Sequence, residues 1–313
     1  QTVDRMYIED SGVDEACTRE QVDVSSGDDG PYQEGFRKAL KITNGNQSNG
    51  AGTSDNIYIN YSIEAQDVAN SGWNYTSSSS FVTLSFWVNS SVAQNFYGRL
   101  YSYDGTAQGY AFETGSLTAG QWKKVIVTIP GNSNLTFDNN TAAGLLIEWC
   151  MFRGTGQTAS MSLNQWGAYD ANSRTPDQTS TWYTTNDATF EITGVQLEVG
   201  SQATAFEHRS FGEELALCQR YCVVDVAHRY WYNGHGGNVY DYQLISFPVT
   251  MRADPTLSFG TSITLTNVNT SGGDDGTGHG SFDVRSTGWQ YSPLSNATGN
   301  TTGKTNYTAS AEL

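Results

Sequence analysis

Short runs in which apolar and polar residues alternate are the feature of this sequence that most restricts its fold. In the run NIYINYSIEA the residues of one parity are apolar: Ile57, Ile59, Tyr61 and Ile63. A strand places successive side chains on opposite faces, so a period of two predicts a half-buried β-strand. A helix would need apolar residues three and four positions apart.

Further runs of the same kind follow along the chain. FVTLSFWVN places Val82, Leu84, Phe86 and Val88 inward with Trp87 opposite, and WKKVIVTIP and TGVQLEV also alternate. GLLIEWCMF is apolar on both faces, which favours a central strand. Phe190 and Ile192 have the opposite parity to the run that follows them, which predicts a β-bulge near Thr193 and Gly194.

An all-β fold is therefore expected. The linkers between the runs are rich in Asn, Ser, Gly and Thr, as in TNGNQSNGAGTSDN, and are typical of loops at the ends of a sandwich. We predict a jelly-roll β-sandwich of two antiparallel sheets over residues 1–209. A single up-and-down barrel is the alternative.

One short helix is expected after the sandwich, over residues 210–222. Ser210 and Glu213 have the S-x-x-E spacing of a capping box. Phe211, Leu215, Cys218 and Cys222 then recur at helical spacing, which predicts a buried apolar stripe containing both cysteines.

The last part of the chain, residues 223–313, predicts a second, small β-sandwich-like domain. VVDVAHRYWYN and NVYDYQLISFPV flank the sequence GHGG, a pattern typical of a hairpin. Loops rich in Gly, Asn, Ser and Thr follow. We expect this domain to be the distal one.

Charge and composition exclude several classes of function. The formal net charge of −16 disfavours nucleic acid and anionic membranes as partners. No apolar run is long enough to span a membrane, and membrane insertion is not expected.

The four cysteines are irregularly spaced, so we expect them to be reduced. The sequence starts at Gln1 without a signal peptide, which suggests that an upstream segment is absent.

Aromatic residues on polar strand faces are the candidate binding residues. Tyr97, Arg99 and Tyr101 share one parity, which Tyr103 continues, with Leu100 opposite, and Trp87 lies on the polar face of its strand. Flat rings beside hydrogen-bonding groups are typical of sites on which sugar rings stack. Packing against a second sheet or a neighbouring subunit is the alternative explanation.

A second set of candidate glycan-binding residues surrounds the expected hairpin tip NGHGG. It comprises Tyr230, Trp231, Tyr232 and His235. Packing within the domain core is the alternative for part of this set.

No catalytic signature is present, and we expect no enzyme. The sequence contains no nucleophile elbow, phosphate-binding glycine loop or H-E-x-x-H motif. Glu113, Glu148, Asp225 and Asp241 lie within or beside expected strands, but nothing in the sequence sets the carboxyl separation that glycoside hydrolysis needs.

The acid pairs Asp28-Asp29 and Asp274-Asp275 are candidate ligands of a structural Ca²⁺, with solvated turn acids as the alternative. No other cofactor is expected.

Several stretches resemble the jelly-roll module of structural proteins of tailed bacteriophages, a module similar to carbohydrate-binding domains and common in marine and cyanobacterial phages. They are ITGVQLEVGSQATAFEHRSFGEELALCQRYC, SIEAQDV, TLSFWVNSS, GQWKKVIVTIPG and NQWGAY, with FPVTMRADPTLSF through YTASAEL at the C-terminal end. The resemblance covers nearly the whole chain. Similar proteins often have PFEHR where this chain has Ala205 before Phe206.

The resemblance implies a virion structural protein: a tail fibre or receptor-binding protein that attaches to host-surface glycans as a homotrimer. Such proteins commonly join other virion proteins through an N-terminal segment, so the expected location is the virion surface, extracellular when the particle is released. A capsid decoration or head fibre protein with a purely architectural role is the alternative. A glycan depolymerase is a further alternative.

Overall fold

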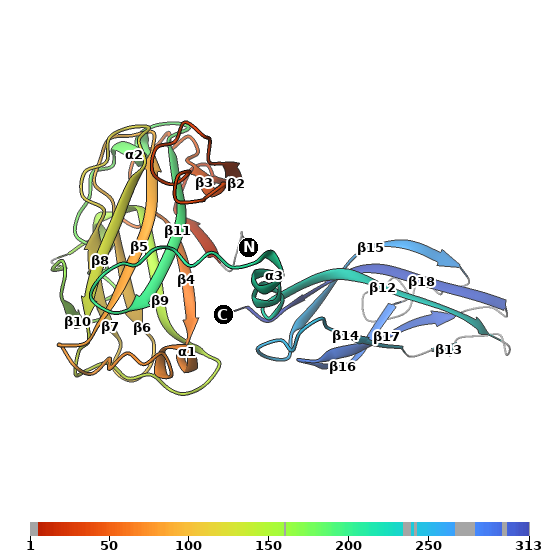
Figure 1. The fold of residues 1–313 in the computed structure, drawn as a ribbon. Coiled ribbons are helices and arrows are strands. Elements are labelled where there is room, and N and C mark those ends of the chain that lie inside the picture. Colours follow the sequence, from red (N-terminus) through yellow and green to blue (C-terminus); the bar gives the residue numbers. More distant parts are fainter. Residues whose placement is uncertain are drawn as a thin grey trace. The chain divides into compact units, whose positions relative to one another are not determined.

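The computed structural model of the chain describes residues 6–159, 161–233, 239–240, 243–266, 279–295 and 299–312. The chain divides into two compact units, Gln1–His208 and Arg209–Glu312. Both are built of antiparallel strands, so the predicted all-β class is confirmed. Figure 1 shows the strands of each unit. No helix among the described residues is long and apolar enough to cross a membrane.

The first unit consists of two antiparallel sheets (Figure 1). The six-stranded sheet has the order β1 (Met6–Ser11), β4 (Asn56–Glu64), β9 (Ala143–Arg153), β6 (Tyr97–Ser102), β7 (Gln108–Glu113), β10 (Trp166–Ala168). The five-stranded sheet has the order β2 (Thr18–Asp23), β3 (Lys38–Thr43), β11 (Thr189–Val199), β5 (Phe81–Ser90), β8 (Lys123–Pro130). Two short helices, α1 (Ala65–Ala69) and α2 (Thr181–Thr184), and the 3-10 turn η2 (Thr155–Gln157) lie in the connections.

The core of the first unit lies between the two sheets. Phe86 on β5 packs edge-to-face against Trp149 on β9, with ring centroids 5.8 Å apart, so the apolar faces of the two sheets meet. The apolar residues predicted from the alternating runs are buried there, including Ile57, Ile59 and Leu84. Fully burying a side chain of this kind stabilises the fold by about 1.5–3 kcal/mol.

Two local predictions about the strands are confirmed. β9, which is apolar on both faces, pairs with β4 on one side and β6 on the other and is therefore central. β11 shifts register against β5 between Thr193 and Gln196, where a bulge was expected. Gly194 lies in this bulge with φ of 62°, and a Cβ there would lie 2.5 Å from the Phe36 ring.

The segment after β11 crosses the outer face of the five-stranded sheet (Figure 1). Phe206 packs on Phe36 with centroids 4.8 Å apart, and a ring nitrogen of His208 lies 2.7 Å from the carbonyl oxygen of Glu34. These contacts cover part of that face with the chain's own residues.

The second unit begins with helix α3 (Phe211–Gln219), which has the predicted capping box. Ser210 Oγ accepts from the Glu213 amide, and the Glu213 carboxylate accepts from the Ser210 amide. The prediction of a buried stripe is wrong. Phe211 is 83% exposed and Leu215 is 42% exposed. The helix also ends before Cys222, which begins the next strand.

Two small sheets form the rest of the second unit. One has the order β12 (Cys222–Asn233), β18 (Gly299–Ser310), β15 (Thr256–Thr266). The other has the order β13 (Val239–Tyr240), β17 (Gly288–Ser295), β14 (Gln243–Ser246), with β16 (His279–Arg285) also paired to β17. Trp289 on β17 packs against Tyr307 on β18 with centroids 5.2 Å apart, so the two sheets share a core.

The expected hairpin between residues 223–233 and 238–249 is wrong in its pairing. β12 pairs along its whole length with β18, from Cys222 opposite Ser310 to Asn233 opposite Gly299. β13 and β14 both pair with β17 instead. The partner of β12 is thus supplied by the C-terminal end of the chain.

Replacing Gly194 with alanine should lower the free energy of unfolding by about 1–3 kcal/mol, because Cβ meets the Phe36 ring and the left-handed conformation disfavours L side chains. Gly167→Ala is the matched control, since no atom lies within 4 Å of a Cβ at that position. Chemical denaturation followed by tryptophan fluorescence measures both variants. Equal stability changes in the two would contradict the role of the bulge.

Candidate functional site

The outer face of the six-stranded sheet carries the candidate site. On β6, Leu100 points into the core, whereas Tyr97, Arg99 and Tyr101 lie on the opposite face, as the alternation predicts. The register sets Arg99 directly opposite Glu148 of the central strand β9. We define the tyrosine–arginine face by its aromatic and charged members: Tyr58, Tyr97, Arg99, Tyr101, Tyr103, Glu148, Arg153, Tyr169 and Arg174.

A buried ion triad forms the base of this face. Glu148 is 1% exposed, and its Oε2 accepts a hydrogen bond from Arg99 Nη2 at 3.0 Å. Its Oε1 accepts from Arg153 Nη2 at 2.5 Å. Arg153 also donates to the Gln157 side chain. Both oxygens of the carboxylate are therefore held by guanidinium groups.

The two arginines keep Glu148 ionised. Burial by itself would raise the pKa of Glu148, but the charges and hydrogen bonds of Arg99 and Arg153 outweigh burial and lower the pKa below its usual value. A charged triad in the interior has little freedom to move without leaving an unpaired charge. Arg99 is therefore fixed in place.

Tyrosine rings surround the Arg99 guanidinium. Its carbon lies 5.4 Å from the Tyr101 ring centroid and 5.6 Å from that of Tyr169. Tyr101 packs edge-to-face on Tyr169 at 4.6 Å and on Tyr103 at 4.8 Å. Tyr103 is 45% exposed, and Tyr101 is partly exposed. The outermost rings thus combine solvent access with a fixed orientation.

The connection from β9 to α2, residues 154–180, lies along this face. The Tyr169 amide donates to the Ala107 carbonyl, and the Asn164 amide donates to the Ala111 carbonyl of β7. Gln178 Nε2 lies 3.5 Å from the sulfur of Cys150 on β9. These bonds attach the connection at both strands and bring Tyr169 and Arg174 to the cluster.

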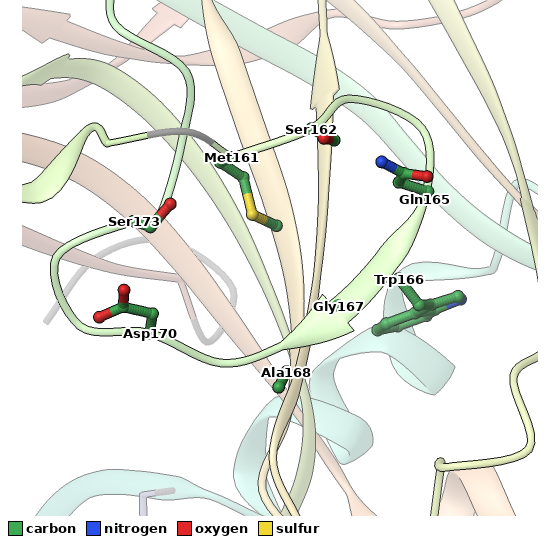
Figure 2. A pocket seen from close by; sticks show the side chains of 8 residues that line it. All are labelled: Met161, Ser162, Gln165, Trp166, Gly167, Ala168, Asp170 and Ser173. Carbon is green, nitrogen blue, oxygen red and sulfur yellow. The ribbon is translucent and has the colours of Figure 1, made fainter.

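Residues of this connection also line a hollow of about 220 Å³, and Figure 2 shows the lining side chains. Met161, Ser162 and Gln165 lie on one part of its wall, Asp170 and Ser173 on another, and β10 contributes Trp166, Gly167 and Ala168. Gly109 of β7 pairs with Gly167 on one side and with Tyr101 on the other. Met161 Cε would lie 3.5 Å from a Cβ at Gly109. The hollow is therefore one strand away from the tyrosine rings.

Trp87 is not part of this face. It lies on β5 of the other sheet, and its Nε1 donates to Glu34 Oε2 at 3.0 Å. A Cβ at Gly30 would lie 2.2 Å from the Trp87 ring, so the backbone of that loop rests directly on the indole. Lys124 lies on the same side, 5.8 Å from the ring centroid. The structure thus separates Trp87 from Tyr97, Arg99 and Tyr101.

The second set of predicted residues is described only in part. Tyr230, Trp231 and Tyr232 belong to β12 and pair with Thr302, Thr301 and Asn300, but only their backbone is described. His235 lies outside the described residues. Their glycan-binding role stays a prediction.

The calcium candidates are also partly described. Asp28 accepts a hydrogen bond from the Ser25 amide, and Asp29 accepts one from the Gln33 side chain. Asp274 and Asp275 lie outside the described residues. Within the described part of the chain, no three His, Cys, Asp or Glu side chains are grouped to hold a metal ion. All four cysteines are free.

The sequence pattern predicts only part of this face. It identifies Glu148 only as an acid within an expected strand, and it does not identify Arg153, Arg174, Tyr58 or Tyr169 as members. One usable signal was present: a glutamate inside the apolar run GLLIEWCMF must be paired if it is buried. The identity of its partners depends on strand register.

No protein-family model matches the chain, and no curated protein matches it. Among solved structures, the enzymatically active domain of tailspike protein 4 of bacteriophage CBA120 is similar at 8% identity with a TM-score of 0.35. That match covers 64% of this chain and 20% of the tailspike chain, so the chain spans about a fifth of the length of that protein.

Two other solved structures are similar at a comparable level. The family 11 carbohydrate-binding module of the cellulase Lic26A-Cel5E of Clostridium thermocellum has 11% identity and a TM-score of 0.29, covering 65% of this chain and 92% of that chain. Discoidin II of Dictyostelium discoideum has 12% identity and a TM-score of 0.22, covering 95% and 94%. Because all three TM-scores are below 0.5, none of these likenesses assigns a function to this chain.

Replacing Glu148 with glutamine should destabilise the protein by about 3–5 kcal/mol, because two buried guanidinium charges lose their counter-charge. Glu113→Gln is the matched control, since Glu113 is exposed on β7 of the same sheet, and should change stability by less than about 0.5 kcal/mol. Chemical denaturation at neutral pH measures both. Equal stability of the two variants would contradict the buried triad.

Stability should also depend on Glu148 at acid pH. Since its pKa is depressed in the folded state, its contribution is present above about pH 4.3, the ordinary glutamate value, and is lost as pH falls through the folded-state pKa. Glu148→Gln lacks this contribution, so its free energy of unfolding should decline less steeply in acid. Parallel declines in variant and wild type would contradict this assignment.

Proposed function

We propose that the chain binds carbohydrate through the tyrosine–arginine face. The observation that supports this most strongly is the packed pair of the partly exposed Tyr101 and the exposed Tyr103, in which Tyr101 adjoins an arginine fixed by a buried carboxylate. Sugars present apolar C–H faces that stack on aromatic rings, and their hydroxyls form hydrogen bonds with polar groups beside the rings.

The rigidity of the face favours binding of a weak ligand. The Arg99 side chain is buried and paired with Glu148, so ordering it adds no cost when ligand arrives. The tyrosines pack on one another at 4.6–4.8 Å, and few rotamers remain to be frozen. The hollow offers polar side chains of Ser162, Gln165 and Asp170 to a neighbouring sugar unit.

A biological setting follows from the sequence resemblance to bacteriophage structural proteins. We propose a tail fibre or receptor-binding protein on the virion surface that attaches to host-surface glycans and is joined to other virion proteins. Several individually weak sugar sites in one oligomer would act together through effective concentration.

Catalysis is not part of this proposal. A general acid in glycoside hydrolysis needs a raised pKa, whereas Glu148 has a lowered one and both its oxygens are occupied. A depolymerase would release new reducing ends from host polysaccharide, and we expect the purified chain to release none.

A homotrimer is the proposed assembly. Large apolar side chains are exposed in the second unit: Phe211, Leu215, Leu217, Val224, Val226 and Leu244. Apolar surface of this kind is typical of interfaces between subunits.

The same observation favours the second candidate function, an architectural role as a capsid decoration or head fibre protein, in which these residues would be contacts within the particle.

Replacing Tyr103 with alanine should weaken glycan binding about tenfold, because one stacking ring is lost. Tyr32→Ala is the matched control: Tyr32 packs on Arg37 at 3.8 Å in the loop before β3, on the other sheet, and should leave binding unchanged. A glycan array identifies a ligand, and calorimetry measures both variants. No binding anywhere on the array, or equal losses in the two variants, would contradict the proposed site.

The oligomeric state gives a separate prediction. Multi-angle light scattering of the purified chain should give three times the chain mass of 34.1 kDa. Phe211→Ser should shift the protein towards the monomer, because Phe211 is the most exposed of the large apolar side chains named above. A wild-type monomer at micromolar concentration would rule out the trimer.

A further inference from the structure

The charged members of the tyrosine–arginine face, three arginines and one glutamate, carry a formal charge opposite in sign to that of the whole chain. The chain has a formal net charge of −16, with 32 acidic and 16 basic residues. In the buried triad, two guanidinium groups face a single carboxylate, which leaves a formal charge of +1. Buried charge is weakly screened, so this excess positive charge acts on the solvent-accessible side of the face.

Arg174 adds a third positive charge at the accessible side. Its Nε donates to the Ala171 carbonyl at 3.1 Å, which fixes the guanidinium plane. The guanidinium carbon lies 6.0 Å from the Tyr169 ring centroid.

Among the described residues, the acidic side chains of this region form hydrogen bonds with groups other than Arg174. Glu113 accepts from the Asn95 side chain, Asp170 from the Asn172 amide, and Asp177 from the Thr158 hydroxyl. Glu9, on β1, interacts with Tyr7. Across the described residues, Arg174 forms no ion pair, and no hydrogen bond of its Nη atoms is found.

We propose that the carbohydrate bound here is acidic and that Arg174 binds its carboxylate or sulfate group. This inference rests on the proposed carbohydrate-binding function and specifies its ligand class. A guanidinium group can donate two parallel hydrogen bonds to a carboxylate or sulfate, which a neutral sugar cannot accept with equal strength. A ring of the same ligand stacks on Tyr101 and Tyr103. Tyr101 packs on both Tyr103 and Tyr169, and Tyr169 lies beside Arg174.

Long-range attraction cannot produce this preference, because the chain as a whole repels anions. At about 0.15 M salt, charges more than roughly 8 Å away are largely screened, so groups that contact the ligand decide the preference. Preference for an acidic sugar under these conditions therefore reports the site itself.

The test compares matched acidic and neutral oligosaccharides on the full 313-residue chain by calorimetry at 0.15 M salt. One arm uses oligogalacturonate and the same oligosaccharide with its carboxyl groups reduced to alcohols. The other uses a sulfated galactose oligomer and its desulfated form. We expect the acidic member of at least one pair to bind about ten- to a hundredfold more tightly.

Arg174→Gln should abolish that preference and leave the weak binding of the neutral member. Arg174→Lys keeps the charge without the planar fork and should retain part of the preference. Arg37→Gln is the matched control, since Arg37 also packs on a tyrosine but on the other sheet, and circular dichroism checks the fold of each variant. The variant at position 37 should behave as the wild type.

The two proposals fail in different ways. If neutral and acidic members of both pairs bind equally, or if Arg174→Gln keeps the preference, the acidic ligand is wrong and carbohydrate binding stands. If neither pair binds and the glycan array is also empty, the proposed function itself is wrong.

Discussion

The pairing of Glu148 with Arg99 and Arg153 is the interaction on which the rest of the candidate site depends. A carboxylate in the central strand of a sandwich is tolerated only because two guanidinium groups compensate its lost hydration. The same bonds tie β9 to β6 and, through Gln157, to the connection that follows β9. The rings of Tyr101 and Tyr169 lie around the guanidinium that this triad holds.

The two sheets of the first unit differ in what covers their outer faces. On the five-stranded sheet, the loop containing Gly30 rests on Trp87, and Phe206 and His208 pack against Phe36. On the six-stranded sheet, the connection carrying Tyr169 and Arg174 adds aromatic and charged groups and leaves Tyr103 exposed. The candidate site is thus decided by loops that cross the sheets, in addition to the strands themselves.

Strand content and side-chain facing could be predicted from the sequence because both depend on residues close together in the chain. The alternation around Leu100 places Tyr97, Arg99 and Tyr101 on one face, and the change of parity at Ile192 locates the bulge at Gly194. The capping box at Ser210 is local in the same way.

The failures of prediction all involve distant parts of the chain. The partner of Glu148 depends on the register between β9 and β6, and the cover on Trp87 comes from a loop more than fifty residues earlier. β12 pairs with the C-terminal strand β18 because strand order is a tertiary property that local pattern does not encode. The apolar spacing of α3 predicts one apolar face, but it does not show whether another element covers that face. In the structure Phe211 and Leu215 on this face are exposed.

The most direct test of this account is a crystal structure of the chain with the oligosaccharide that binds it most tightly. The account predicts a sugar ring against Tyr101 and Tyr103 on the outer face of the six-stranded sheet, with Arg99 still bonded to Glu148 beneath it. A sugar bound on the five-stranded sheet beside Trp87, or on the second unit alone, would contradict it.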